Sequence, residues 1–242
     1  MNLLCLDIGN TSITICKSNK KMLGPLNRLP SSKNFTEILS DYDPKSIDSI
    51  IMCSVVPELT NILVNYCNSN NIDIFEINYK KSSVNFLVDT PSEIGNDRIC
   101  NIVGARKYSN TASIIIDFGT ATTYDVINDD GDFIGGAIAP GVDISADYLI
   151  AKTAQLKNTI YKFPDNVIGT NTTSNIQSGV MFGGLESIKG MVELIKKEIN
   201  SLNVKVIITG GFGLLISNAL ETKHTYNETL TIEGMLEIFF DS

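Results

Sequence analysis

Both halves of the chain open with an apolar run that ends on an Asp and a turn. Residues 3–6 are apolar and lead through Asp7 to Gly9, after which residues 12–16 alternate apolar and polar side chains. Residues 113–127 repeat this arrangement around Asp117 and Gly119. Alternation with a period of two predicts strands. Each arrangement therefore predicts a strand, a tight turn and a returning strand.

Other apolar patterns predict further elements in both halves. Apolar residues at helical spacing predict helices at residues 35–42, 57–67, 97–108, 175–199 and 230–239. Short apolar runs bounded by turn residues predict strands at residues 49–57, 72–77, 133–139 and 204–213, the last running into a Gly-rich turn. The polar stretch 152–174 is expected to be a mobile loop. The sequence thus predicts an α/β protein with an internal duplication, divided into domains 1–112 and 113–242.

Composition narrows the classes of partner. The formal net charge is −8 and the isoelectric point is about 4.7, a balance that repels nucleic acid phosphates and anionic membranes. No apolar run approaches the roughly 18 residues that span a bilayer, and the first apolar run is too short for a signal peptide. The five cysteines form no C-x-x-C pair, which is typical of reduced intracellular thiols. We therefore expect a cytoplasmic protein without a nucleic-acid or membrane partner.

The two Asp-x-Gly turns can bind phosphate. A turn with Gly presents backbone N–H groups without a Cβ in the way, and nearby Ser and Thr hydroxyls add donors. An Asp at the strand end can hold a cation beside that phosphate. A single Asp-x-Gly is most simply a hairpin turn, but two matched copies followed by hydroxyls favour a nucleotide held by both halves.

Three other segments carry weaker signals. The Gly-rich turn TGGFG (209–213) does not continue as G-x-G-x-x-G, and no G-x-x-x-x-G-K-[ST] exists in the sequence, so a P-loop protein is excluded. That turn either approaches an adenosine or is simply close-packed. Asp97 and Arg98 stand at a helix entrance, where the Asp is either a cap or a proton acceptor, and the Arg could bind an anion. Gly179, Gly183 and Gly184 in a helix suggest close approach by another backbone or a ligand.

The chain resembles the type III pantothenate kinases, which belong to the superfamily of actin and acetate kinase. The motifs that carry the resemblance run in order along nearly the whole chain: DIGNT (7–11), SVVP (54–57), IGNDR (94–98), DFGTATTYDV (117–126), GGAIAPGV (135–142), NTTSNIQSG (171–179) and TGG (209–211). The resemblance implies two ribonuclease-H-like, actin-like ATPase halves, with mixed sheets flanked by helices. It also implies that ATP lies between these halves and that its γ-phosphoryl group passes to the primary hydroxyl of pantothenate, the first step of coenzyme A biosynthesis.

The resemblance also implies roles for individual residues. Asp97 corresponds to the catalytic proton acceptor, and Asp117 to a ligand of a monovalent cation, K⁺ or NH₄⁺. The first phosphate loop, with Asp7 near Mg²⁺, would comprise Asp7, Ile8, Gly9, Asn10, Thr11, Ser12, Ile13 and Thr14. Thr120 would contact ATP from the second loop. Pantothenate would contact Gly95, Asn96, Asp97, Arg98 and Thr172. Family members are usually homodimers, with the substrate site near the subunit interface.

One position departs from the family pattern. Val88 stands where the family commonly has a Tyr, seven residues before the Gly of G-x-D-R, so a hydroxyl that could bond the substrate is missing. Two alternatives therefore stay open. The protein could phosphorylate a different small hydroxy acid, or it could be an ATP-binding regulatory protein without catalytic activity.

Overall fold

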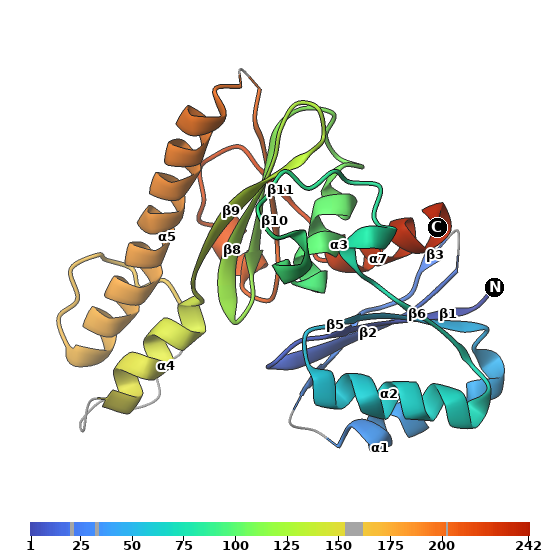
Figure 1. The fold of residues 1–242 in the computed structure, drawn as a ribbon. Helices are drawn as coiled ribbons and strands as arrows, with labels where there is room; N and C mark the ends of the chain where they lie inside the picture. Colours follow the sequence, from blue (N-terminus) through green and yellow to red (C-terminus); the bar gives the residue numbers. More distant parts are fainter. Residues whose placement is uncertain (20–21, 32–33, 153–161, 202) are drawn as a thin grey trace. The chain divides into compact units, whose positions relative to one another are not determined.

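The computed structural model describes residues 1–19, 22–31, 34–152, 162–201 and 203–242. The chain divides into two compact units. Unit 1 comprises Met1–Tyr108 together with Thr229–Ser242, and unit 2 comprises Ser109–Glu228. Each unit contains one β-sheet with helices packed against it (Figure 1). No helix within the described ranges is long and apolar enough to cross a membrane.

Unit 1 has a six-stranded mixed sheet with the order β3-β2-β1-β5-β6 and with β4 paired to β2. Its strands are β1 (Leu3–Ile8), β2 (Ser12–Asn19), β3 (Met22–Leu23), β4 (Asn27–Pro30), β5 (Ser49–Ser54) and β6 (Asp73–Glu76). Its α-helices are α1 (Phe35–Ser40), α2 (Pro57–Asn70), α3 (Asn96–Ala105) and α7 (Leu230–Asp241), and its 3₁₀ turns are η1 (Pro44–Ser46), η2 (Tyr79–Lys81) and η3 (Pro91–Glu93).

The two faces of the unit 1 sheet are covered by different helices. On one face, Leu6, Ile13 and Met52 join α1 and α2 in a continuous apolar core, with α2 running along this face in Figure 1. Side chains alternate between faces along a strand, so Asp7 and Thr14 project to the other face. That second face is covered by α3 and α7, which contact β5.

Unit 2 has a five-stranded mixed sheet with the order β11-β10-β7-β8-β9. Its strands are β7 (Ser113–Phe118), β8 (Ala121–Ile127), β9 (Phe133–Pro140), β10 (Lys205–Thr209) and β11 (Thr225–Tyr226). Its helices are α4 (Val142–Lys152), α5 (Thr172–Ile199) and α6 (Gly213–Ser217). The apolar side of α5, including Leu185, Ile188 and Val192, packs on one face of this sheet.

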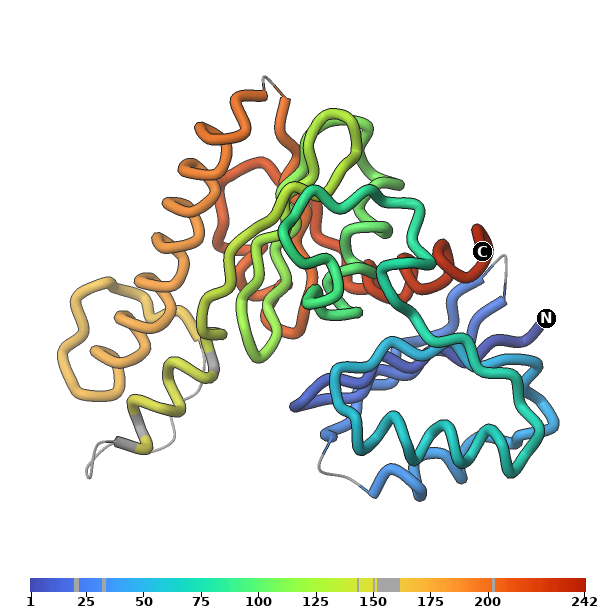
Figure 2. The backbone as a smooth tube through the Cα atoms, in the orientation of Figure 1, coloured from blue at the N-terminus to red at the C-terminus, as the bar shows by residue number. Residues whose placement is uncertain are grey.

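Contacts divide the chain differently from the expected boundary near residue 112, because the C-terminal helix α7 belongs to unit 1. In Figure 2, α7 (red) runs beside α3 (green). Glycines make this approach possible. A Cβ on Gly234 would overlap the backbone of Cys100, and a Cβ on Gly104 would lie 2.6 Å from the Leu230 carbonyl oxygen. The division into ribonuclease-H-like domains at 1–112 and 113–242 stays a prediction.

Most predicted elements are present, but the sequence patterns missed several short ones. The strands β3, β4 and β11 and the helices α4 and α6 were not predicted. The expected mobile loop at residues 152–174 includes residues 153–161, which lie outside the described residues. The long helix begins three residues earlier than expected, because Asn171 caps it and forms a capping box with Ser174.

Candidate active site

The first turn joins β1 to β2 and is held by backbone bonds. The Gly9 amide donates to the Ser12 carbonyl at 3.0 Å, and a Cβ on Gly9 would lie 3.1 Å from that oxygen. Asp7 stands before the turn, paired in register with Thr14 on β2. Asp7 is half-buried, whereas Asn10 and Thr11 are exposed. The turn predicted from the sequence is therefore present, with a carboxylate at one end and exposed polar residues at its tip.

The segment Gly95–Arg98 begins α3 in the same unit. The Asn96 side-chain amide donates to the Ser54 carbonyl at the end of β5, at 3.2 Å. Gly95 occupies the N-cap position, and the Asp97 carboxylate accepts a bond from the Arg98 amide at 2.8 Å. A Cβ on Gly95 would lie 2.5 Å from the Asp97 Oδ1 atom. Asp97 is thus not the N-cap residue, and Gly95 leaves the space that its carboxylate occupies.

Two buried thiols link Asp7 to Asp97. Cys53 is paired with Asp7 in register on β5, and Cys100 lies one turn beyond Asp97 on α3. The hydrogen bond to Cys100 raises the pKa of the Cys53 thiol, as do burial and the negative charges of Cys100, Asp7 and Asp97. Burial raises the pKa of Cys100, with the same two carboxylates adding to the shift and the bond to Cys53 opposing it. Each of the two carboxylates therefore neighbours one thiol of this pair, Asp7 across the sheet and Asp97 along α3.

The second turn joins β7 to β8 in unit 2 and is one residue shorter. The Gly119 amide donates to the Ala121 carbonyl at 3.1 Å, and Asp117 is paired in register with Thr123. Thr120 is exposed at the tip of this turn. Each turn therefore follows an Asp that faces a Thr on the returning strand, as the internal duplication predicts.

The Gly-rich turn after β10 packs against this second Asp. Gly210 has a φ of +90°, and a Cβ there would overlap the Asp117 Oδ1 atom and lie 2.5 Å from the Phe118 amide nitrogen. A Cβ on Gly213 would lie 2.9 Å from the Tyr226 ring. These contacts are those of a close-packed turn. The alternative that the turn approaches an adenosine stays a prediction.

Thr172 lies in unit 2, as the first residue of α5, and is exposed. It lines a groove of about 770 Å³, together with residues of β8, β9, α4 and α5. The expected close approach at the α5 glycines is absent within the described chain. A Cβ on Gly179 or Gly183 would meet no atom within 4 Å, and one on Gly184 would meet only Val142, at 3.9 Å. Packing within the described chain therefore does not explain these glycines.

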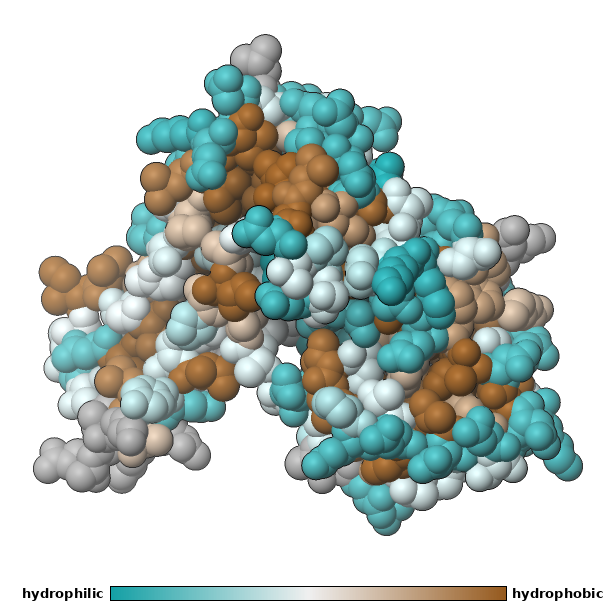
Figure 3. Space-filling model, viewed as in Figure 1, coloured by the Kyte–Doolittle hydropathy of each residue, from teal (hydrophilic) through white to brown (hydrophobic). Residues whose placement is uncertain are grey.

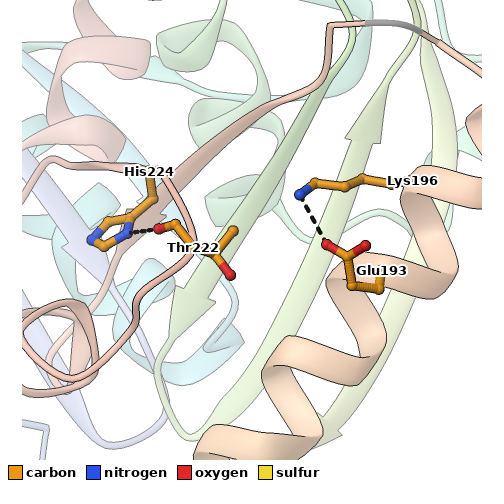
Figure 4. Close-up of polar contacts among 4 residues, drawn as sticks. All are labelled: Glu193, Lys196, Thr222 and His224. Atoms are coloured by element: carbon orange, nitrogen blue, oxygen red, sulfur yellow. Dashed lines mark hydrogen bonds and ion pairs between the residues drawn. The ribbon is translucent and has the colours of Figure 1, made fainter.

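The single histidine has a structural role. His224 is half-buried. Its Nδ1 lies 2.6 Å from the Thr222 carbonyl oxygen, which can only accept, so Nδ1 carries the hydrogen (Figure 4). Its Nε2 lies 2.7 Å from the Ser217 hydroxyl. These bonds tie the end of α6 to the segment before β11. The Lys196–Glu193 pair in the same view is an ion pair on the exposed side of α5.

A family comparison identifies the chain. The family model described as type III pantothenate kinase matches residues 3–194. The chain belongs to the type III pantothenate kinase family. The resemblance drawn from the sequence motifs is therefore confirmed, as is the expectation that the protein is an enzyme of the kinase class.

Individual relatives agree with the assignment to the type III pantothenate kinases. The chain is 34% identical to the type III pantothenate kinase of Agathobacter rectalis over 250 residues, which cover 96% of this chain and 95% of that protein. A Campylobacter jejuni structure described as a Baf family transcriptional activator has a TM-score of 0.66 at 21% identity, covering 98% of both chains. An archaeal actin homologue, Ta0583, has a TM-score of 0.58 at 11% identity over the whole of both chains. The likeness to the actin homologue confirms the expected actin-like fold.

Unit 1 also contains site features that the sequence patterns did not reveal. On β4 and just beyond it, Arg28 and Ser31 contact the first turn or the strand that follows it. The β4 strand has only four residues and no clear alternation, so no periodic signal marked it. The contact between Cys53 and Cys100 was equally hidden, because 46 residues separate the two positions in the sequence and only the sheet and α3 bring them together.

Proposed function

We propose that the chain transfers the γ-phosphoryl group of ATP to the primary hydroxyl of pantothenate. The products are 4′-phosphopantothenate and ADP, and the reaction is the first step of coenzyme A biosynthesis. Family membership over nearly the full chain supports this substrate pair. The observation that carries the proposal is that β5 contacts both segments, because Asp7 is paired in register with Cys53 and the Asn96 side chain donates to the Ser54 carbonyl at 3.2 Å. It brings the phosphate turn and the substrate segment to one region of unit 1.

Asp97 is the proposed proton acceptor. The hydroxyl oxygen of pantothenate attacks the γ-phosphorus, its proton passes to the Asp97 carboxylate, and the bond from the γ-phosphorus to the bridging oxygen breaks to release ADP. Arg98 binds the carboxylate of pantothenate as a planar cation, and Gly95 and Asn96 position the same segment. Phosphoryl transfer depends mainly on positioning and charge neutralisation, which the amides and hydroxyls of residues 7–14 provide.

The residues present fit a magnesium ion that is shared with the nucleotide. Among the described residues, no three His, Cys, Asp or Glu side chains gather as a metal site. Mg²⁺ at kinase sites is typically held by one or two carboxylates together with phosphate oxygens and water. Asp7, beside the first turn, suits such a site, with water between its carboxylate and the ion. When bound there, Mg²⁺ would neutralise charge on the phosphates.

The second turn is proposed to hold ATP and a monovalent cation. Thr120 would donate to the phosphates from the exposed tip of the turn. Asp117 would bind K⁺ or NH₄⁺. The close packing of Gly210 on the Asp117 carboxylate supports this role, because it fixes one oxygen donor against backbone atoms. A carboxylate oxygen can coordinate K⁺ or accept a hydrogen bond from NH₄⁺.

We also propose that the protein is a homodimer with Thr172 at the substrate site near the interface. Unit 2 exposes large apolar side chains: Ile138 is 65% exposed, Tyr148 66% and Ile168 84%. Brown surface gathers over α4 and the chain before α5 in Figure 3. Exposed apolar surface of this kind supports an interface with a second copy. Light scattering coupled to gel filtration would measure the mass, and a monomer at micromolar concentration would contradict the proposal.

The cytoplasm is the proposed location. All five cysteines are buried and unpaired by disulfides, which is what a reducing compartment favours.

The decisive experiment measures ADP release with Mg·ATP and pantothenate, first in K⁺ and then in Na⁺. We expect turnover that depends on pantothenate and is faster in K⁺. Replacing Asp97 by Asn should lower kcat by about 10²-fold or more if it is the general base. Near-normal turnover by that variant would reduce Asp97 to a residue that stabilises the start of α3. Nucleotide binding without ADP release would favour a regulatory protein.

One observation favours a second substrate. Val88 is half-buried and cannot donate the hydrogen bond that a Tyr would offer there. Measuring ADP release with other small hydroxy acids and with pantothenate would show which of them is the better substrate. A higher kcat/KM for another acid would replace pantothenate as the substrate while leaving the kinase assignment in place.

A further inference from the structure

Four strands of unit 1 place one polar row on the face that α3 covers. Asp7 is paired in register with Thr14 on β2 and with Cys53 on β5. Thr14 is paired in turn with Arg28 on β4. Residues directly opposite one another in a sheet project to the same face. Because neighbouring strands are about 4.8 Å apart, the Arg28 backbone lies roughly 10 Å from that of Asp7.

Backbone and side-chain bonds fix Arg28 relative to the first turn. The Arg28 Nε donates to the Thr14 hydroxyl at 3.5 Å, and Thr14 is itself buried. Three residues further on, the Ser31 hydroxyl donates to the Gly9 carbonyl at 2.7 Å, and the Ser31 amide donates to the Thr11 carbonyl at 2.9 Å. The strand that carries Arg28 is therefore tied to both arms of the phosphate turn.

The charge of Arg28 is not neutralised locally. Within the part of the chain that the structure describes, no carboxylate forms an ion pair with it, and its Nε bond at 3.5 Å is a long one. Arg28 is also exposed to solvent. The guanidinium group can therefore turn toward an anion at the first turn without breaking a strong interaction.

The choice of arginine at this position is informative. Arg28, Arg98 and Arg106 are the arginines of the sequence, and lysine supplies the remaining cations. Of these, Arg98 stands beside Asp97 and Arg28 stands in the row of Asp7. Arginine presents a rigid fork of donors that matches phosphate oxygens two at a time, which lysine cannot do.

We propose that Arg28 binds the γ-phosphate oxygens of ATP and stabilises the charge on the phosphoryl group as it is transferred. The proposal rests on the ATP-dependent function proposed above. In this row, Arg28 lies on one side of Asp7. Cys53 lies on the other side, which is the side of Asp97. When a phosphoryl group moves toward a substrate hydroxyl at Asp97, the Arg28 cation therefore lies on the opposite side of that group.

The test compares nucleotides with and without a third phosphate. Binding of Mg·ADP and of a non-hydrolysable Mg·ATP analogue to the full chain is measured by isothermal titration calorimetry for wild type, Arg28→Gln and Arg28→Lys. A hydrogen-bonded charge contact predicts that Arg28→Gln weakens analogue binding by about 10- to 100-fold. It should weaken ADP binding by less than about 3-fold. Arg28→Lys should lie between, because it keeps the charge but loses the fork.

Lys17→Gln is the matched control. Lys17 lies on the next strand, β2, and its side chain lies over the Tyr42 ring on the opposite face of the sheet, so the variant removes the same charge away from the turn. We expect unchanged nucleotide affinities for this variant. Equal weakening of ADP and analogue binding by Arg28→Gln, or an equal effect of Lys17→Gln, would overturn the proposal.

Folding and substrate identity are checked separately. If a thermal melt shows that Arg28→Gln does not fold, Arg28→Lys carries the test, and analogue binding as tight as wild type in that variant would refute a bidentate contact. Absence of pantothenate-dependent ADP release by the wild type would contradict the proposed substrate. It would not affect the role of Arg28, which is judged on the difference between two nucleotide affinities.

Discussion

Replacing Gly234 by Ala would test the packing of α7 on α3. A Cβ at this position would overlap the Cys100 carbonyl oxygen and would lie 2.5 Å from its carbonyl carbon and 2.9 Å from its Cα. All three atoms are backbone atoms within α3. No side chain can rotate to make room, so one helix must shift as a whole.

The expected loss of stability follows from two opposing effects. Ala is favoured over Gly inside a helix by roughly 0.5–1 kcal/mol. Overpacking a well-packed site typically costs about 1–3 kcal/mol, and a clash with backbone belongs at the upper end. The net loss should therefore be about 2 kcal/mol. For a chain of this size, that corresponds to a Tm lower by roughly 4–8 °C.

The matched control is the same substitution at Gly190 on α5. Gly190 is exposed, and a Cβ there would meet no atom within 4 Å. Only the helix preference remains, so Gly190→Ala should stabilise the protein by about 0.5–1 kcal/mol and raise the Tm by a few degrees. Thermal melts followed by circular dichroism at 222 nm would measure both variants. A Tm for Gly234→Ala at or above the wild-type value would refute the packing argument.

Three further predictions concern single groups. Hydrogen bonds from the Ala112 amide and the Ser201 hydroxyl lower the pKa of Asp129, so Asp129 stabilises the fold fully above its unfolded pKa of about 3.8, and this stability is lost as pH falls through the lower folded pKa. Asp129→Asn should therefore lower the stability at pH 7 and flatten its acid dependence in urea melts. An unchanged profile of stability against pH would argue against the two bonds. Burial raises the pKa of Cys67 to about 11, and every cysteine is buried; a thiol reagent at pH 8 should therefore modify the native protein slowly and all five thiols once guanidinium unfolds it, whereas fast native modification would show exposed thiols. Thr231→Val should lower the free energy of unfolding by about 1–3 kcal/mol, because it removes a donor 2.8 Å from the amide oxygen of the fully buried Asn101. In the same denaturation assay, Thr231→Ser should keep most of the wild-type free energy of unfolding, because it retains the hydroxyl.

The duplicated turns show how much of the structure can be predicted from the sequence. Apolar runs fixed the strands on either side of Asp7 and Asp117, and Gly9 and Gly119 marked the turns, because local geometry decides where a chain can reverse. The motifs also indicated the kinase family, which the comparisons confirmed. The prediction could not show that the first turn is one residue longer, since that depends on the register of strand pairing.

The α5 glycines show where local reasoning fails. Three small residues in a helix suggested close contact, yet Gly179 and Gly183 face open space within the described chain. The contacts that do need glycine are at Gly104 and Gly234, whose positions on two helices gave no local signal. Close approach depends on which helices cross, and sequences 130 residues apart do not reveal that.

The sequence by itself determined the α/β class, the two matched Asp-x-Gly turns, the position of Asp97 at a helix entrance and the kinase family. Each of these follows from local periodicity, turn chemistry or motif order. Only the tertiary structure decided that α7 joins unit 1 and that Cys53 and Cys100 lie together near both carboxylates. It also decided that Arg28 stands in the row of Asp7. Strand register and helix packing set these neighbours, because they depend on contacts between residues far apart in the chain.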